Sequence, residues 1–236
     1  MKLRSALGRL RRGFTRWRTP VRLDAWTRAE PVSRRFGLDR GAAVDRRYIE
    51  RFLTENAETI RGHVLEVGDD AYTRRFGVGR VSQSDVLYAV PGQPGATLVG
   101  DLARPETLPE RRYDTFICTQ TLNCILDPAQ ALAGARRVLR EGGTLLLTVS
   151  GISQISRYDA DRWGMYWGFT PQSLGKLLEG AFPGAHTIHA YGNPLAAAAL
   201  LYGLAVEDLP DPALLDVADP DYPVVLAAVA RRLGAP

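Results

Sequence analysis

Carboxylates recur along the first half of the chain, each in or just after a short apolar run. Glu66 stands in the first run, Asp85 follows the second and Asp101 follows the third. Nineteen positions separate Glu66 from Asp85, close to the offset of about 20 residues at which an acid meets the ribose of a bound dinucleotide. One carboxylate can accept both hydrogens of a diol. The spacing therefore predicts a nucleoside-binding site.

Other catalytic signatures do not occur in the sequence. It has no Gly-x-Ser-x-Gly elbow, no Walker motif and no spaced set of metal ligands. Cys118 and Cys124 lie six positions apart, which is neither a redox pair nor a zinc pattern. His63, His186 and His189 flank predicted strands away from the predicted site, so we expect them to be structural or merely exposed.

The elements that must position these carboxylates alternate between apolar runs and helical periodicity. Strands are predicted at residues 63–68, 79–86, 96–99, 113–119, 144–149 and 187–191, and residues 223–231 suit either a strand or a helix. Helices are predicted at residues 42–60, 128–140, 173–178 and 196–206. This alternation is typical of an open α/β sheet covered on both faces, in which ligands bind at the carboxyl ends of the strands.

Taken together, these motifs resemble those of class I S-adenosylmethionine-dependent methyltransferases. Residues 64–68 resemble the first motif of that family, residues 113–122 the fourth, and residues 135–143 the helix and turn before the fifth strand. The resemblance implies a Rossmann-like, seven-stranded, mostly parallel sheet with helices on both faces, and S-adenosyl-L-methionine as the cofactor. The cofactor-binding residues that it implies are Glu66, Gly68, Asp69, Asp85, Val86, Asp101, Leu102, Thr119 and Gln120.

The first motif departs from the family in one respect. The family usually carries E/D-x-G-x-G-x-G, whereas here Asp70 and Tyr72 replace the second and third glycines. Those glycines let the backbone approach the methionine part of the cofactor, so Asp70 narrows that approach. A sulfonium tolerates nearby carboxylates better than a pyrophosphate does, and the acidity of this turn argues against a dinucleotide. The alternative is a degenerate fold that binds no cofactor.

Two flanking segments are predicted to face the acceptor of the methyl group. Residues 36–50 resemble, more loosely, a segment of bacterial methyltransferases that accompany glycosyltransferases. Residues 152–170 mix aromatic and ionic side chains, which suits sugar stacking and hydroxyl binding, although such residues also anchor loops and pair at surfaces. The catalytic candidates in this segment are Tyr158, Asp159 and Asp161.

The activity expected from these features is methyl transfer to a hydroxyl of a sugar, a glycan or a natural product. One alternative is methylation of carbon or nitrogen in a small molecule. Another is a non-catalytic partner that kept the fold and docks to a membrane-side biosynthetic complex. Binding to nucleic acid is not expected, because the abundance of Arg over Lys is what a GC-rich coding sequence produces.

Residues 1–22 form a basic tail, and residues 23–236 are predicted to be a single methyltransferase-like domain. The tail carries eight Lys and Arg residues and no acid, so the net charge of +4 leaves −4 for the body. Its apolar residues recur at helical spacing: Leu3, Leu7, Leu10, Phe14 and Trp17. We expect an amphipathic helix that packs on the body or on a second subunit of a homodimer, or that lies on an anionic membrane surface.

The composition is that of a globular protein, with 45% hydrophobic and 24% charged residues. No apolar stretch reaches the roughly 20 residues of a membrane-spanning helix. The Arg-rich start lacks the apolar region of a signal peptide. We therefore expect a cytoplasmic protein, with the tail as its one means of peripheral attachment to a membrane.

Overall fold

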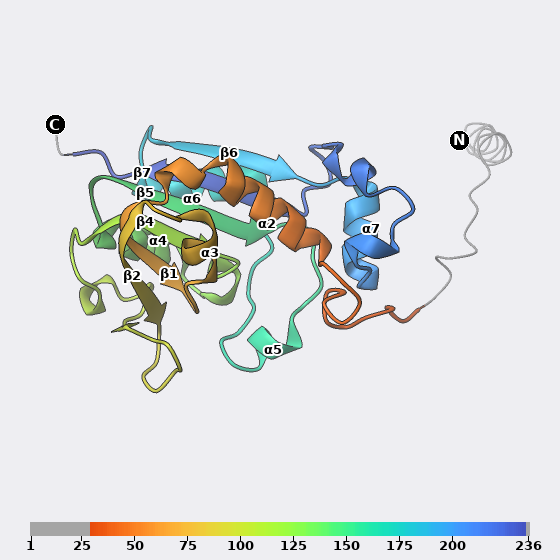
Figure 1. The fold of residues 1–236 in the computed structure, drawn as a ribbon, viewed down its shortest axis with the longest axis horizontal. Helices are drawn as coiled ribbons and strands as arrows, with labels where there is room; N and C mark the ends of the chain where they lie inside the picture. The colour runs from red at the N-terminus through yellow and green to blue at the C-terminus, as the bar shows by residue number, and fades with distance from the viewer. Residues whose placement is uncertain (1–28, 235–236) are drawn as a thin grey trace, which may run out of the picture. The chain divides into compact units, whose positions relative to one another are not determined.

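The computed structural model describes residues 29–234. Val32–Pro236 forms one compact unit, built on a seven-stranded sheet with the order β3-β2-β1-β4-β5-β7-β6 (Figure 1). The amphipathic helix predicted within residues 1–22 lies outside the described residues, so it stays a prediction. Among residues 29–234, no helix is long and apolar enough to cross a membrane.

The sheet is parallel except for one strand. β1 (Gly62–Val67) pairs in parallel with β2 (Val81–Tyr88) and β4 (Tyr113–Thr119). The short β3 (Leu98–Val99) pairs in parallel with β2, and β5 (Leu139–Ser150) pairs in parallel with β4. β7 (Val225–Arg231) runs antiparallel between β5 and β6 (His186–Tyr191). The predicted seven-stranded, mostly parallel sheet is confirmed, and its last segment is a strand.

Helices cover both faces of the sheet, as predicted. On one face, α4 (Pro128–Val138) and α6 (Pro171–Ala181) share a buried cluster with Phe116 and Leu145. On the other, α2 (Val44–Glu55) and α7 (Pro194–Tyr202) share a second cluster with Ile117 and Leu146. Consecutive residues of β4 and β5 belong to different clusters because successive side chains of a strand point to opposite faces. A continuous apolar run in the sequence therefore supplies both cores.

Local chemistry sets the ends of the helices. Asp127 caps α4 by accepting a hydrogen bond from the backbone N–H of Gln130 at 3.0 Å, as the sequence predicted. α4 ends at Val138, two residues earlier than predicted, because Leu139 already pairs with Tyr113 in the sheet. α7 ends at Tyr202, four residues earlier than predicted, because Gly203 takes the left-handed conformation (φ 67°) that stops a helix.

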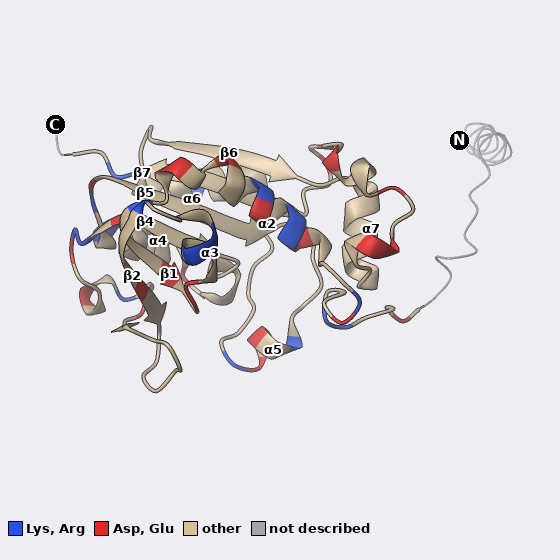
Figure 2. Cartoon of the chain, viewed as in Figure 1, with Lys and Arg blue, Asp and Glu red and all other residues tan. Residues whose placement is uncertain are grey.

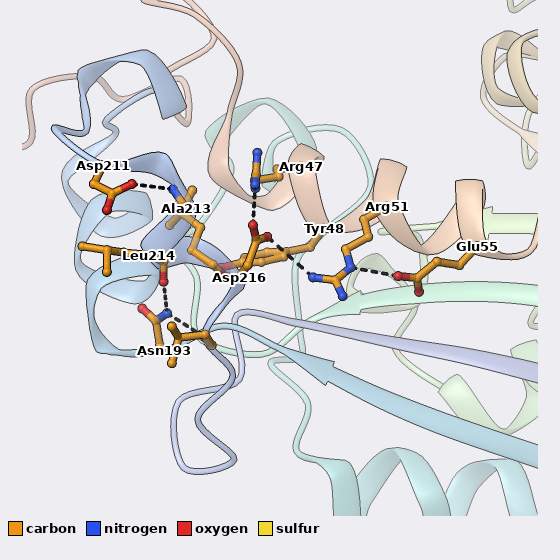
Figure 3. A network of polar contacts seen from close by, with 11 residues as sticks. Arg47, Tyr48, Arg51, Glu55, Asn193, Asp211, Ala213, Leu214 and Asp216 are labelled. Atoms are coloured by element: carbon orange, nitrogen blue, oxygen red, sulfur yellow. Dashed lines mark hydrogen bonds and ion pairs between the residues drawn. The ribbon is translucent and has the colours of Figure 1, made fainter.

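A polar network on the outer side of α2 fixes that helix to the C-terminal part of the chain (Figure 3). Arg47 and Arg51 both reach the carboxylate of Asp216, at 2.8 and 3.5 Å. The Tyr48 hydroxyl donates to the carbonyl of Leu215 at 2.8 Å. Asn193, which caps α7, holds the same segment through the carbonyl of Leu214. The start of α2, which reaches the candidate site, is thereby held in place.

Candidate active site

A small pocket, partly open to solvent, lies beyond the carboxyl ends of β4 and β5. This is the edge of an open α/β sheet at which ligands bind. Its floor comes from residues that follow β4 and end β5: Gln120, Asn123, Cys124 and Ser150. One wall comes from the segment around the start of α2: Phe36, Leu38, Ala43, Asp45 and Arg46. The opposite wall comes from the loop after β5: Ser153, Ser156, Asp159 and Met165.

Two pocket residues hold strained backbone conformations. Among the described residues three non-glycines have positive φ, and two of them, Phe36 (58°) and Gln120 (50°), line the pocket. Such conformations cost of order 1–3 kcal/mol each and persist where the surroundings enforce them. The backbone N–H of Gln120 donates to Thr148, and its side-chain carbonyl accepts from the Ser150 hydroxyl at 2.6 Å. These hydrogen bonds fix the conformation of Gln120 in the floor of the pocket.

The wall around Phe36 packs against the segment that follows α7, which also binds it by hydrogen bonds. Gly37 packs so closely on Leu204 that an added Cβ would lie 2.6 Å from the Leu204 carbonyl oxygen. Asp208, in the 3-10 turn η4 (Val206–Asp208), binds the Arg40 guanidinium with both oxygens, at 2.6 and 2.7 Å. These hydrogen bonds hold the pKa of Asp208 at about 2. The wall is therefore fixed by residues far away in the sequence.

The opposite wall is fastened by Asn123, which is 2% exposed. Its amide nitrogen donates to the Trp167 carbonyl at 2.6 Å, and its amide oxygen accepts from the backbone N–H of Ser150 at 3.1 Å. Its backbone carbonyl accepts from Tyr166 at 2.8 Å. One residue thus ties the end of the loop to the ends of β4 and β5. Nothing in the sequence marks Asn123, because all these partners are more than 25 positions away.

The three catalytic candidates are placed differently. Asp159, on the short helix α5 (Arg157–Ala160), lines the pocket, and its carboxylate has no ion-pair partner among the described residues. Tyr158 is 64% exposed, and its ring lies 3.7 Å from the Arg162 guanidinium. Asp161 is 68% exposed and 3.9 Å from Arg157. Of the three, the structure brings only Asp159 into the pocket.

Asp45 and Arg46 were not among the predicted site residues, although they lie in the segment predicted to face the acceptor. Burial raises the pKa of Asp45, against the opposing effect of the neighbouring Arg46. The Arg46 guanidinium donates to the Tyr72 hydroxyl at 2.6 Å. Tyr72 follows the turn at the end of β1, so this bond links the acceptor wall to the predicted cofactor turn.

The end of β1 carries the features of the first motif. Glu66 is 2% exposed and accepts three hydrogen bonds, from the N–H groups of Tyr72 and Thr73 and from the Thr73 hydroxyl. Burial raises its pKa to about 7, against the lowering effect of these bonds. Gly68 has φ 86°, and a Cβ added there would meet nothing within 4 Å. The backbone at Gly68 is therefore open to a ligand on the side where a Cβ would point.

The end of β2 is different from the prediction. The second strand was expected to end at Asp85 and Val86, but β2 continues to Tyr88. Asp85 pairs with Leu65 in the middle of the sheet, and Val86 is 6% exposed. The expected ribose contact at the carboxyl end is therefore wrong in its placement of both residues. Ser84 and Asp85 are polar and interrupt the apolar run, so the sequence pattern alone places the end of the strand too early.

The remaining predicted cofactor residues stand at the expected edge. Asp101 lies two residues after the end of β3, accepts from the Ala103 N–H at 2.9 Å and pairs with Arg104 at 3.1 Å. Leu102 is buried, and Thr119 ends β4. Asp69 is exposed at the turn after β1 and accepts from the Ala71 N–H at 2.8 Å. A nucleoside-sulfonium cofactor fits this edge at Gly68 and Asp101, while Tyr72 and the end of β2 differ from the family pattern.

Comparisons with known proteins bear on the fold. A family model described as "Methyltransferase domain" matches residues 81–147. The N-methyltransferase NodS from Bradyrhizobium japonicum WM9, solved with S-adenosyl-L-homocysteine, has 15% identity and a TM-score of 0.51 over 83% of this chain and 90% of that chain. The [4+2]-cyclase SpnF has 16% identity and a TM-score of 0.53 over 83% of this chain and 84% of that chain. The comparison with curated proteins found no significant match.

At such identities the solved structures show the fold alone. The fold is Rossmann-like, and the match to the methyltransferase family model over residues 81–147 lies within it. Among residues 29–234, no group of His, Cys, Asp and Glu could hold a metal ion.

Proposed function

We propose that this chain, which carries a methyltransferase domain on a class I methyltransferase fold, transfers the methyl group of S-adenosyl-L-methionine to a hydroxyl bound in the pocket. The observation that carries the proposal is the position of the pocket. β1 and β4 are neighbours in the sheet, so the open turn at Gly68 lies beside Gln120 in the pocket floor. An acceptor in the pocket then faces a cofactor held at the end of β1.

Residues of three strand ends would hold the cofactor: Gly68 after β1, Asp101 and Leu102 after β3, and Thr119 and Gln120 at the end of β4. Glu66 would act indirectly, because its carboxylate is committed to the backbone of the turn. When bound, S-adenosyl-L-methionine supplies an electrophilic methyl group.

The chain itself orients the acceptor and removes its proton. The Asp159 carboxylate is within the pocket and free of an ion pair among the described residues, so it can accept the proton of the attacking hydroxyl. Asn123 and η4 hold the two walls and so limit the positions that an acceptor can take. Polar groups of Ser153 and Ser156 on the same wall can bind further hydroxyls of the acceptor.

Two other functions are compatible with the fold. An amine or a carbon nucleophile could occupy the same pocket, and the [4+2]-cyclase SpnF is a reminder that one fold supports different reactions. A non-catalytic partner would keep the sheet without binding the cofactor. The unpaired Asp159 favours the first proposal, because a carboxylate that accepts a proton is what a hydroxyl acceptor requires.

The test is titration calorimetry of the full chain with S-adenosyl-L-methionine and S-adenosyl-L-homocysteine. We expect both to bind, and Gly68→Val to abolish binding because the new side chain fills the open space above the turn. Gly79→Val is the matched control, since Gly79 also has a positive φ (74°) and open space but precedes β2 at the opposite edge. Both variants carry about 1–2 kcal/mol of backbone strain. Equal loss of binding in both, or no binding to the parent chain, would refute the proposal.

A further inference from the structure

Trp163 lies one helical turn beyond Asp159. Its backbone N–H donates to the Asp159 carbonyl at 2.7 Å, so the two side chains leave the same side of the α5 segment. Asp159 lines the pocket and Trp163 does not. From the one-turn spacing we infer that the indole lies next to Asp159, just outside the pocket. In Figure 1, this segment stands on a long loop that leaves the sheet beyond β5.

Within residues 29–234, the indole of Trp163 has no polar partner. It is 36% exposed, and its ring nitrogen makes no hydrogen bond within the described residues. Trp167 on the same loop differs, because its ring nitrogen donates to the Ile125 carbonyl at 3.0 Å. Trp167 thus holds the loop in place, whereas Trp163 has a partly exposed indole one helical turn from Asp159, whose carboxylate has no ion pair among the described residues.

The surroundings of Trp163 suit a neutral, hydroxyl-rich ring. Acidic and basic residues mix along the α5 segment (Figure 2), and the charges of Arg157, Asp159, Asp161 and Arg162 cancel. An anionic lipid surface would require an excess of cations here. A flat phenol would require an apolar slot, whereas the surface of this pocket is divided about evenly between polar and apolar atoms.

We propose that Trp163 and Asp159 together bind a pyranoside ring of the acceptor. The face of a pyranose on which C–H groups gather packs on the indole, while a hydroxyl at the ring's edge reaches the carboxylate. The inference deepens the proposed function, because it names a sugar ring as the acceptor class and Trp163 as the residue that selects it.

The experiment uses the full chain labelled with 5-fluorotryptophan and saturated with S-adenosyl-L-homocysteine. Trp163→Phe identifies the fluorine resonance of Trp163, and the Trp167 resonance is the internal control. The probes are methyl α-D-mannopyranoside, methyl α-L-rhamnopyranoside and methyl β-D-glucopyranoside, each titrated separately. Sorbitol tests a polyol without a ring face, catechol tests a flat phenol, and phosphatidylglycerol vesicles test a lipid surface.

We expect at least one pyranoside to shift the Trp163 resonance saturably, more than that of Trp167, and sorbitol to leave it unchanged. Asp159→Asn should weaken that binding about tenfold or more, since a hydrogen bond to a charged group is lost. Trp163→Ala, followed by calorimetry, should abolish it, and Trp163→Phe should retain part of it. No shift with any pyranoside, or a shift with catechol or vesicles alone, would overturn the inference.

Failure of this inference is distinguishable from failure of the proposed function. If S-adenosyl-L-homocysteine does not bind but a pyranoside still shifts the Trp163 resonance, the sugar site is supported and methyl transfer is refuted. If S-adenosyl-L-homocysteine binds and no pyranoside shifts the Trp163 resonance, methyl transfer remains supported and the sugar site is refuted.

Discussion

The carboxylate of Asp85 lies 2.8 Å from Nε2 of His63, toward the amino ends of β1 and β4 and away from the pocket. The Tyr113 hydroxyl donates to the same carboxylate at 3.0 Å, and the Thr97 hydroxyl donates at 2.8 Å. Burial alone would raise the pKa of Asp85, but these hydrogen bonds keep it below its ordinary value. Asp85 is therefore a structural acid that joins three strands and the loop before β3.

Asp85→Ala should lower the free energy of unfolding by about 2–4 kcal/mol, because it leaves the buried Tyr113 hydroxyl and the half-buried His63 ring without their acceptor. Urea unfolding measures this change. The affinity for S-adenosyl-L-homocysteine, measured by calorimetry at a temperature where the variant is folded, should stay the same. A variant of unchanged stability with much weaker cofactor binding would instead restore the ribose role that the sequence suggested.

Glu66 predicts a dependence of stability on pH. Its pKa is about 7 in the folded chain, owing first to burial, and about 4.5 for an ordinary glutamate. The folded state then binds the extra proton between these values, so its stabilising effect is complete below about pH 4.5 and is lost as the pH rises through 7. The full loss amounts to about 3 kcal/mol.

Glu66→Gln removes this titration while it keeps one acceptor for Thr73. We expect the unfolding free energy of the parent chain to fall relative to the variant between about pH 5 and about pH 8. Urea unfolding of both proteins at several pH values gives the difference, in which all other titrating groups cancel. A constant difference across this range would contradict the raised pKa.

Much of the fold could be predicted because its signals are local. β4 was predicted with its observed bounds, since a continuous apolar run needs no distant partner to be recognised. The cap of α4 was predicted because Asp127 and Pro128 are neighbours. α3 (Ala71–Phe76) and α5 were not predicted, because helices of six and four residues carry too few turns to show a period.

The site was predictable only in part because its acids depend on distant partners. Asp85 resembled a strand end until His63 and Tyr113, 22 and 28 positions away, supplied its hydrogen bonds inside the strand. Asp159 and Asp161 have the same chemistry and nearly the same position in the sequence. The direction of α5 decides which of the two carboxylates enters the pocket. That direction is set by the Ser156 cap and by the hydrogen bond from Asn123 to the Trp167 carbonyl.

The basic tail is expected to pack on the body or on a second subunit, or to lie on an anionic membrane surface, and the membrane alternative has a direct test. Deleting residues 1–22 should leave binding of S-adenosyl-L-homocysteine unchanged, because the core clusters lie within the body. It should abolish sedimentation with phosphatidylglycerol vesicles at low salt, where the charge of the eight cations is least screened. A chain with Phe14 and Trp17 replaced by Ser separates the apolar contribution from the charge. If the intact protein does not sediment with these vesicles, the attachment does not exist.

Asn123 predicts the mobility of the acceptor wall. Asn123→Ala should raise hydrogen exchange across residues 152–168, because the Trp167 carbonyl and the Ser150 N–H lose their buried partner. The cost to global stability should be about 1–3 kcal/mol. Asn123→Asp is a partial substitute, since it keeps the acceptor for Ser150 but loses the donor to Trp167. Exchange that rises equally in α4 and α6 would indicate general destabilisation rather than release of this loop.

Asp159 and Asp161 form a matched pair for identifying the base. Both are acids of one short segment, but only Asp159 lines the pocket, while Asp161 is 68% exposed. With a saturating acceptor, Asp159→Asn should lower kcat by about 10²–10⁴-fold, the usual contribution of a general base. Asp161→Asn should leave kcat nearly unchanged. The measurements are the initial rate of S-adenosyl-L-homocysteine formation and, separately, the affinity for that product, which neither variant should alter. Equal losses of kcat in the two variants would remove Asp159 from this role.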